Sequence, residues 1–187
     1  RGGLAVDIIL EEKSATHIRY QTVRNPLTTA DFQELAVLIL ERTNPFVAAT
    51  WHTDHKNYDQ ARNLLNQDVS ANPNARKDLD NGLLCNIASR EDPNSDAAKS
   101  ACTMALRLYP DSAFVQNSLG SHAWRRKDYE GARFHFNRAL ALDPFYANPM
   151  FNRCYLDAIN PPASNPNLYG CQMAMRLDPD NPAYYDS

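Results

Sequence analysis

The chain has 187 residues, enough for one domain with a sizeable core or for a short array of stacked repeats. Its 19 Lys and Arg residues are outnumbered by 22 Asp and Glu residues, so no basic field exists for a long nucleic-acid footprint. The sequence has no apolar run of about 18 residues and no signal-peptide pattern, and its six Gly form no phosphate loop. These features argue against nucleic-acid binding, membrane insertion of this segment and phosphate-cradling chemistry.

The N-terminal part of the chain predicts a β-hairpin followed by a helix. Apolar residues alternate with polar ones over 4–10 and again over 18–22, the pattern of two half-buried strands. Thr28 with Asp31 then resembles a helix capping arrangement, and apolar residues follow at helical spacing over about 29–42. Because two strands alone are marginally stable in water, we expect the hairpin to pack on this helix, on the helices that follow, or on strands outside this chain.

Beyond residue 43 the sequence repeats itself at a step near 34 residues, with a Pro closing each unit. Pro110 and Pro144 are 34 residues apart, Pro179 follows after 35, and Pro73 precedes Pro110 by 37. Matching Ala and Leu positions share these steps, so four units are visible, each with room for two helices. We expect first helices at about 45–56, 75–90, 111–126 and 145–159, and second helices at about 58–71, 95–108, 128–142 and 166–177.

The third of these units resembles the tetratricopeptide repeat, whose pattern is W-x2-L-G-x2-Y…A-x3-F…P. Leu119 and Gly120 match the Leu-Gly pair of the pattern, Ala132 and Phe136 match A-x3-F, and Pro144 closes the unit. The Trp and the Tyr of the pattern are replaced by other residues. The other units match less well, and better in their second helices than in their first.

The resemblance implies a mostly α fold, an α-solenoid of about four tetratricopeptide-like helix hairpins. Small residues such as Gly120 and Ala132 let paired helices approach closely, while Leu119 and Phe136 fill the space beside that contact. Stacking of neighbouring pairs then buries the remaining apolar faces. We therefore expect three parts: the N-terminal β-hairpin and helix in 1–43, the repeat array in 44–180 and a C-terminal tail in 181–187.

The resemblance also implies a binding surface, because such arrays present their first helices along a concave groove that takes a peptide or a protein. Amide side chains on these first helices can hydrogen-bond with a peptide backbone, and aromatic rings on them offer surface on which a partner can anchor. The alternative for Trp124 and Phe151 is that they pack between repeats. In the family's frame the groove residues are Phe114, Asn117, Ser121, Trp124, Arg125, Asn148, Phe151, Asn152 and Tyr155.

The four cysteines form two pairs with one spacing. Cys85 and Cys102 are 17 residues apart, as are Cys154 and Cys171, and the Leu and Phe of the third unit have the same separation. In the family's frame each pair would face across a helix hairpin. Disulfides would indicate a periplasmic or otherwise extracytoplasmic location. Alternatively, the cysteines are small buried hydrophobes in place of Leu and Phe, and the chain is cytoplasmic.

The histidines do not form a recognisable reactive site. His52 and His55 lie three residues apart on a predicted helix, but no partner pair completes the four ligands of a structural metal, so we interpret them as exposed polar residues at a helix end. His17, His122 and His135 are isolated, and no nucleophile motif accompanies them. We expect no catalytic site, no metal and no cofactor.

These observations favour a non-catalytic scaffold or adaptor that binds a protein or peptide partner. One alternative is an accessory or sensor domain of a larger membrane-anchored or enzymatic protein, since the chain begins at Arg1 without an initiator Met. Another is self-assembly into a homo-oligomer, because repeat arrays without polar end helices expose apolar surface that can stack on a second copy.

Overall fold

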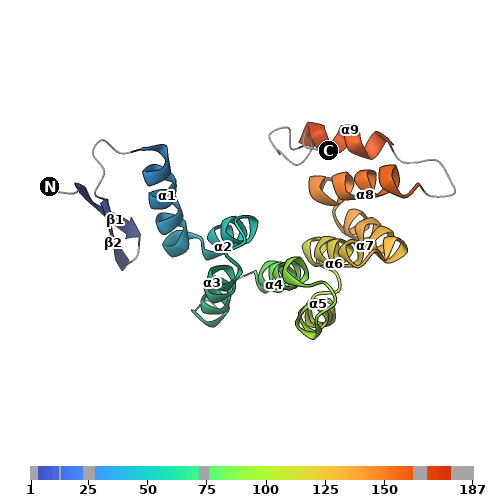
Figure 1. Ribbon diagram of the computed structural model, residues 1–187, viewed down its shortest axis with the longest axis horizontal. Coiled ribbons are helices and arrows are strands. Elements are labelled where there is room, and N and C mark those ends of the chain that lie inside the picture. The colour runs from blue at the N-terminus through green and yellow to red at the C-terminus, as the bar shows by residue number, and fades with distance from the viewer. Residues whose placement is uncertain (1–3, 13, 23–27, 72–75, 162–167, 178–187) are drawn as a thin grey trace. The chain divides into compact units, whose positions relative to one another are not determined.

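A computed structural model of the chain describes residues 4–12, 14–22, 28–71, 76–161 and 168–177 (Figure 1). The chain divides into two compact units, Arg1–Ala75 and Arg76–Ser187. The C-terminal tail expected over 181–187 lies outside the described residues.

The first unit begins with two paired strands. Strands β1 (Leu4–Glu12) and β2 (Ser14–Thr22) are antiparallel, with Leu4 opposite Thr22 and Glu12 opposite Ser14. They occupy the two alternating stretches of the sequence. Strand β2 contacts helix α1 (Thr29–Thr43), which follows it in the chain.

Helix α1 begins at a reciprocal cap, which confirms the predicted role of Thr28 and Asp31. The Thr28 hydroxyl oxygen accepts a hydrogen bond from the Asp31 backbone N–H, and the Asp31 carboxylate accepts one from the Thr28 backbone N–H at 2.8 Å. Two backbone donors that a helix start leaves without partners are thereby satisfied.

A single residue, Asn44, connects α1 to helix α2 (Pro45–Asp54) and caps both helices. Its backbone N–H donates to Leu40 at the end of α1, and its side chain accepts from the Val47 N–H at the start of α2. Pro45 occupies the first helical position, where its missing N–H costs nothing. Helix α3 (Tyr58–Ala71) packs back on α2.

This connection explains a difference from the predicted domain boundaries. We expected α2 and α3 to belong with the later helix pairs in one array over 44–180, separate from residues 1–43. The structure divides the chain after Ala75 instead, with α2 packed on both α1 and α3. No linker separates α1 from α2, because the one residue between them makes backbone hydrogen bonds on both sides.

The second unit contains three helix pairs in the residues described (Figure 1). First helices α4, α6 and α8 pack on second helices α5, α7 and α9 respectively, and each pair also contacts the next. The array of helix hairpins is therefore confirmed, and each observed helix end lies within two residues of its predicted position. The bounds are α4 Lys77–Glu91, α5 Asp96–Leu108, α6 Ala113–Arg125, α7 Tyr129–Leu142, α8 Ala147–Ile159 and α9 Leu168–Leu177.

The turns inside two hairpins, one in each unit, have the same geometry. Lys56 after α2 and Lys127 after α6 have φ values of 61° and 62°, in the left-handed region. Asp128 N–H then reaches back to Ala123 O at 2.9 Å, and Asn57 N–H reaches back to His52 O at 2.8 Å. This is a Schellman ending, in which the left-handed residue lets the last carbonyls find partners. The same local motif therefore closes a first helix in both units.

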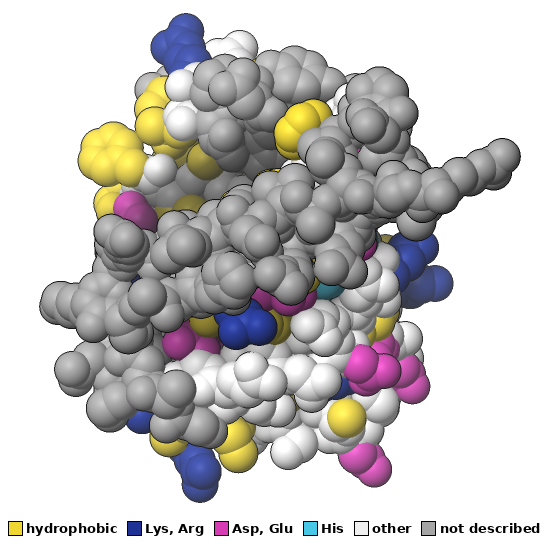
Figure 2. Space-filling view, turned by 90° about the vertical axis from the view of Figure 1, so that its left-hand side faces the viewer, with side chains coloured by type: hydrophobic (Ala, Val, Ile, Leu, Met, Phe, Trp, Pro, Cys, Tyr) yellow, Lys and Arg dark blue, Asp and Glu magenta, His cyan; other side chains and the backbone are white. Residues whose placement is uncertain are grey.

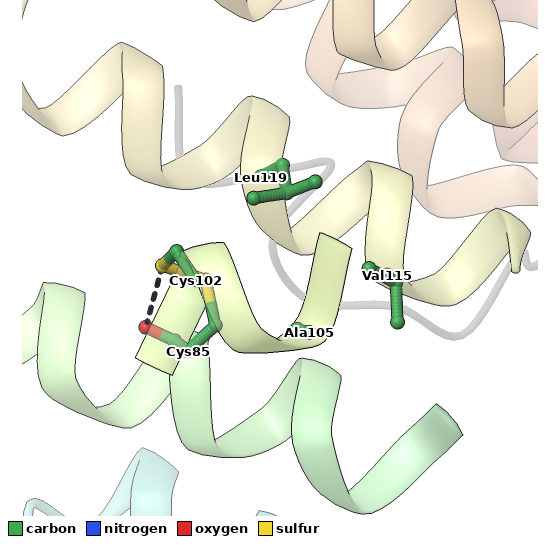
Figure 3. Close-up of a cluster of buried hydrophobic side chains, with 5 residues drawn as sticks. All are labelled: Cys85, Cys102, Ala105, Val115 and Leu119. Carbon is green, nitrogen blue, oxygen red and sulfur yellow. Dashed lines mark hydrogen bonds between the residues drawn. A yellow bond between two sulfur atoms is a disulfide. The ribbon is translucent and has the colours of Figure 1, made fainter. Parts of the chain in front are cut away.

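The core of the second unit lies at the contacts between successive pairs. Cys85, Cys102, Ala105, Val115 and Leu119 form one buried cluster, which joins α4 and α5 to α6 (Figure 3). A second buried cluster joins α6 and α7 to α8, and it contains Ala123, Ala132, Phe136 and Leu156. Each cluster spans a repeat boundary, so neighbouring pairs stabilise one another.

These clusters correct one expectation about packing inside the best-matching repeat. We expected Leu119 and Phe136 to fill the same space, whereas Leu119 belongs to the cluster on the preceding pair and Phe136 to the cluster with α8. The close approach itself lies where predicted. A Cβ atom on Gly120 would lie 2.5 Å from the ring of Phe136, so only a glycine fits between α6 and α7 here.

Candidate functional site

The residues expected in the binding groove lie on one side of α6 and one side of α8. We call this set the first-helix face. On α6 its members recur at helical spacing, so their side chains leave the helix in similar directions. The face comprises Phe114, Asn117, Ser121, Trp124 and Arg125 of α6, with Asn148, Phe151, Asn152 and Tyr155 of α8.

A row of aromatic rings crosses from one helix pair to the next. The ring centroids of Trp124 and Tyr155 are 5.3 Å apart, and those of Tyr155 and Phe151 are 6.3 Å apart. All three residues are half-buried. Trp124 also packs against the buried cluster that contains Phe136, so the alternative of packing between repeats holds for this side chain.

The amides of the face are partly used within the protein. Asn152 donates from Nδ2 to Oδ1 of Asn117 at 3.0 Å, which links α8 to α6. Asn117 is buried, whereas Asn148 is exposed at the start of α8. The expectation that all three amides face a ligand is therefore too simple, because the side chains of Asn117 and Asn152 first bind each other.

Two other members of the face connect α6 to the preceding first helix. The ring of Phe114 lies so close to Gly82 of α4 that a Cβ there would be 2.6 Å from it. Arg125 donates from Nη2 to Oδ1 of Asn86, at 3.5 Å. Ser121 is buried. Phe114 is thus held between repeats, and Asn86 joins the face although the weak resemblance of α4 to the repeat pattern gave it no predicted place.

Charge does not dominate the visible surface. In the view of Figure 2 the charged side chains of the described residues are of both signs and are scattered. This agrees with the small net charge of −3.

A buried serine and histidine pair lies between α4 and α6, and the sequence reasoning missed it. Ser89 Oγ donates a hydrogen bond to the Cys85 carbonyl oxygen at 2.8 Å and lies 2.7 Å from Nδ1 of His122. Burial lowers the pKa of His122, and the nearby cations of Arg126 and Arg125 lower it further. Ser89 is fully buried and His122 is 8% exposed, so the pair links α4 to α6 inside the second unit.

The neighbouring histidines of α2 have different surroundings. His52 is buried and binds Glu41 of α1 through Nε2 at 2.8 Å, so the interpretation of His52 as an exposed residue is wrong. The reason is that α1 covers this side of α2, which the repeat pattern does not include. His55 is exposed and stacks on Trp51. Within the described ranges, no three His, Cys, Asp or Glu side chains gather closely enough to hold a metal ion.

A buried ion network joins α7 to α8. Arg133 donates from Nε to Asp157 at 3.0 Å and from Nη2 to the Asn160 carbonyl at 2.6 Å. Arg153 binds the other oxygen of Asp157 at 3.1 Å. Asp157 is 1% exposed and Arg133 8%, so both charges depend on the partners in this network in place of water.

Each cysteine pair forms a disulfide across a helix hairpin. Cys85 of α4 is bonded to Cys102 of α5, with Cα atoms 4.6 Å apart (Figure 3). Cys154 of α8 is bonded to Cys171 of α9, with Cα atoms 5.4 Å apart. These are the two pairs that the 17-residue spacing suggested.

Comparison with known proteins identifies one repeat directly. Residues 113–146 match the family model for the tetratricopeptide repeat. The crystal structure of yeast Tom70 has the same fold, with a TM-score of 0.55 at 19% sequence identity. The match covers 82% of this chain and 32% of that one, so the present chain spans about a third of the Tom70 chain. No curated protein matches the sequence. None of the helices in the described part is long and apolar enough to cross a membrane.

Proposed function

We propose that this chain, whose residues 113–146 match the tetratricopeptide repeat and whose fold is similar to that of Tom70, is a non-catalytic scaffold or adaptor that binds a peptide or protein segment on its first-helix face. The observation that carries the proposal is the aromatic row of Trp124, Tyr155 and Phe151, which crosses a repeat boundary and is half-buried along its length. Aromatic side chains that are supported from below and open above are the usual anchors of protein interfaces.

The support beneath the row favours binding with little reorganisation. Trp124 packs against the cluster of Phe136, and the Asn117–Asn152 hydrogen bond fixes α6 relative to α8 beside it. Side chains that are already held lose little conformational freedom when a ligand covers them. The aromatic rings then supply apolar contact, and Asn148 at the exposed end of the face supplies donors and acceptors for a peptide backbone.

A matched set of variants tests this proposal. Phe151→Ala and Tyr155→Ala remove rings of the row, and Phe134→Ala removes an aromatic ring that is 65% exposed on the second helix α7. We expect proteins that co-purify with the wild-type chain to be lost from the first two variants, with affinity reduced at least about tenfold, and retained by the third. Circular dichroism of each variant checks that the helices persist. Equal loss from all three variants, or from none, would contradict the proposal.

The two disulfides bear on location. We infer that the chain works in a periplasmic or otherwise extracytoplasmic compartment, because thiols of cytosolic proteins are kept reduced. Thiol titration of protein unfolded without reductant, after purification from its native compartment, tests the inference. No free thiol is expected, and four free thiols would refute it.

A further inference from the structure

The two disulfides differ in how far solvent reaches them. Cys85 is 0% exposed and Cys102 2%, and both belong to the buried cluster with Ala105, Val115 and Leu119 (Figure 3). Cys154 and Cys171 are only half-buried. A thiolate must touch a disulfide sulfur to attack it, so exposure controls the rate of exchange.

An apolar pocket leads to the more exposed pair. Its volume is about 280 Å³ and it lies where α7, α8 and α9 meet. Cys154 itself forms part of the pocket wall. The space is large enough to hold a small organic thiol beside Cys154. The other lining residues are Leu140, Pro144, Met150, Arg153, Gly170 and Met173.

The second helices α5 and α9, each disulfide-bonded to its first helix, differ in how many other helices they pack against. Helix α5 contacts α4 and also α6 of the next pair, so it is enclosed on two sides. Among the described residues, α9 packs chiefly on α8, and the pocket occupies part of its boundary with the end of α7. Met175 and Leu177 of α9 are 37% and 40% exposed. Among the described residues, α9 therefore has less helix packing besides its disulfide-bonded partner than α5 has.

From these differences we propose that Cys154–Cys171 is a thiol-exchange site whose reduction releases α9, while Cys85–Cys102 is a permanent staple. The reactant is a small thiol. Its thiolate attacks Sγ of Cys154 through the pocket, forms a mixed disulfide and displaces Cys171 as a thiolate, which takes a proton from water. A second thiolate attacks the reactant's sulfur in that mixed disulfide and releases Cys154. Two thiols are oxidised to one disulfide, and one protein disulfide is reduced to two thiols.

The chain supplies its own control, because both disulfides close loops of equal length. Protein purified without reductant is treated with 2-mercaptoethanol, quenched with iodoacetamide at intervals and digested for mass spectrometry. We expect Cys154 and Cys171 to be alkylated at least about tenfold faster than Cys85 and Cys102. Amide hydrogen exchange over 168–177 should rise with the same time course, while exchange over 96–108 stays slow.

Two double variants separate the bond from the helix. Cys154→Ala with Cys171→Ala should give fast amide exchange in α9 with or without the thiol. Cys85→Ala with Cys102→Ala should keep the thiol response of α9. The proposal is overturned if both disulfides react at one rate in the wild-type chain, if α9 exchange ignores reduction, or if the cysteines are free before treatment. The thiol-exchange proposal depends on the oxidised cysteine pairs and not on peptide binding. Refuting it leaves the peptide-binding proposal valid, and refuting peptide binding leaves thiol exchange valid.

Discussion

Gly120 lies at the closest approach of α6 and α7, and its replacement by Ala tests the packing of the best-matching repeat. The added Cβ would lie 2.5 Å from Cδ1 and Cε1 of Phe136, and the ring has no room to retreat because Phe136 is fully buried. Overpacking of this kind costs about 1–3 kcal/mol. An Ala in a helix interior is otherwise favoured over Gly by about 1 kcal/mol.

The gain in helix propensity offsets part of the clash, so Gly120→Ala should destabilise the protein by up to about 2 kcal/mol. Gly120→Leu should cost more, about 3 kcal/mol or above, because the extra carbons point into the same ring. Denaturant unfolding followed by circular dichroism gives both values. An exposed substitution on α5, Ser100→Ala, serves as the control for propensity alone and should be neutral or slightly stabilising.

A double-mutant cycle identifies the cause. Phe136→Leu replaces the opposing ring with a smaller side chain. Gly120→Ala should therefore cost less in that background, with a coupling energy of about 1 kcal/mol or more. Gly120→Ala that raises stability, or Gly120→Leu that leaves it unchanged, would refute the close approach. Full additivity in the cycle would show that Phe136 is not the partner.

Three further predictions concern buried charge, pH and a turn. Asp157→Ala should cost about 3 kcal/mol, because it leaves Arg133 buried without its main counter-ion, and a loss below about 1 kcal/mol in the same unfolding assay would show that the network contributes little. Burial, followed by Arg126, lowers the pKa of His122 in the folded state, so the unfolded chain binds more protons at mildly acidic pH. Stability should therefore fall as the pH drops below about 6.5, the pKa of an unfolded histidine, and His122→Asn should flatten this dependence; an unaltered pH profile would contradict the assignment. Lys127→Gly should stabilise by up to about 1 kcal/mol, because glycine adopts the φ of 62° without strain, and a lower melting temperature would argue against the left-handed turn.

The helices could be predicted because residues close in sequence determine where each helix begins and ends. Asn44, Ser95 and Ser112 accept hydrogen bonds from the first turns of α2, α5 and α6, and each precedes the apolar pattern of its helix. The cysteine pairing was one of two alternatives at the sequence level, and it rested on the repeat resemblance, whose frame places residues 17 apart across a helix hairpin. Short-range signals therefore determined nearly all of the secondary structure.

The contacts between repeats could not be predicted in this way. Ser89 meets His122 across 33 residues, and Asn117 meets Asn152 across 35. Such pairs depend on the rotation of one helix relative to the next and on side-chain rotamers, which the repeat pattern leaves open. For the same reason the pattern placed Asn117 on a binding face without revealing that its side chain already has a partner.

The central claim is that a partner binds the first-helix face, and site-specific crosslinking tests it most directly. A photoreactive phenylalanine analogue is placed at Asn148, which is exposed on that face, or at Phe134, which is exposed on α7, and the chain is irradiated in its native cells. We expect a crosslinked protein from position 148, with none from position 134, and loss of that crosslink in Phe151→Ala. Crosslinking from position 134 alone, or from neither position, would contradict it.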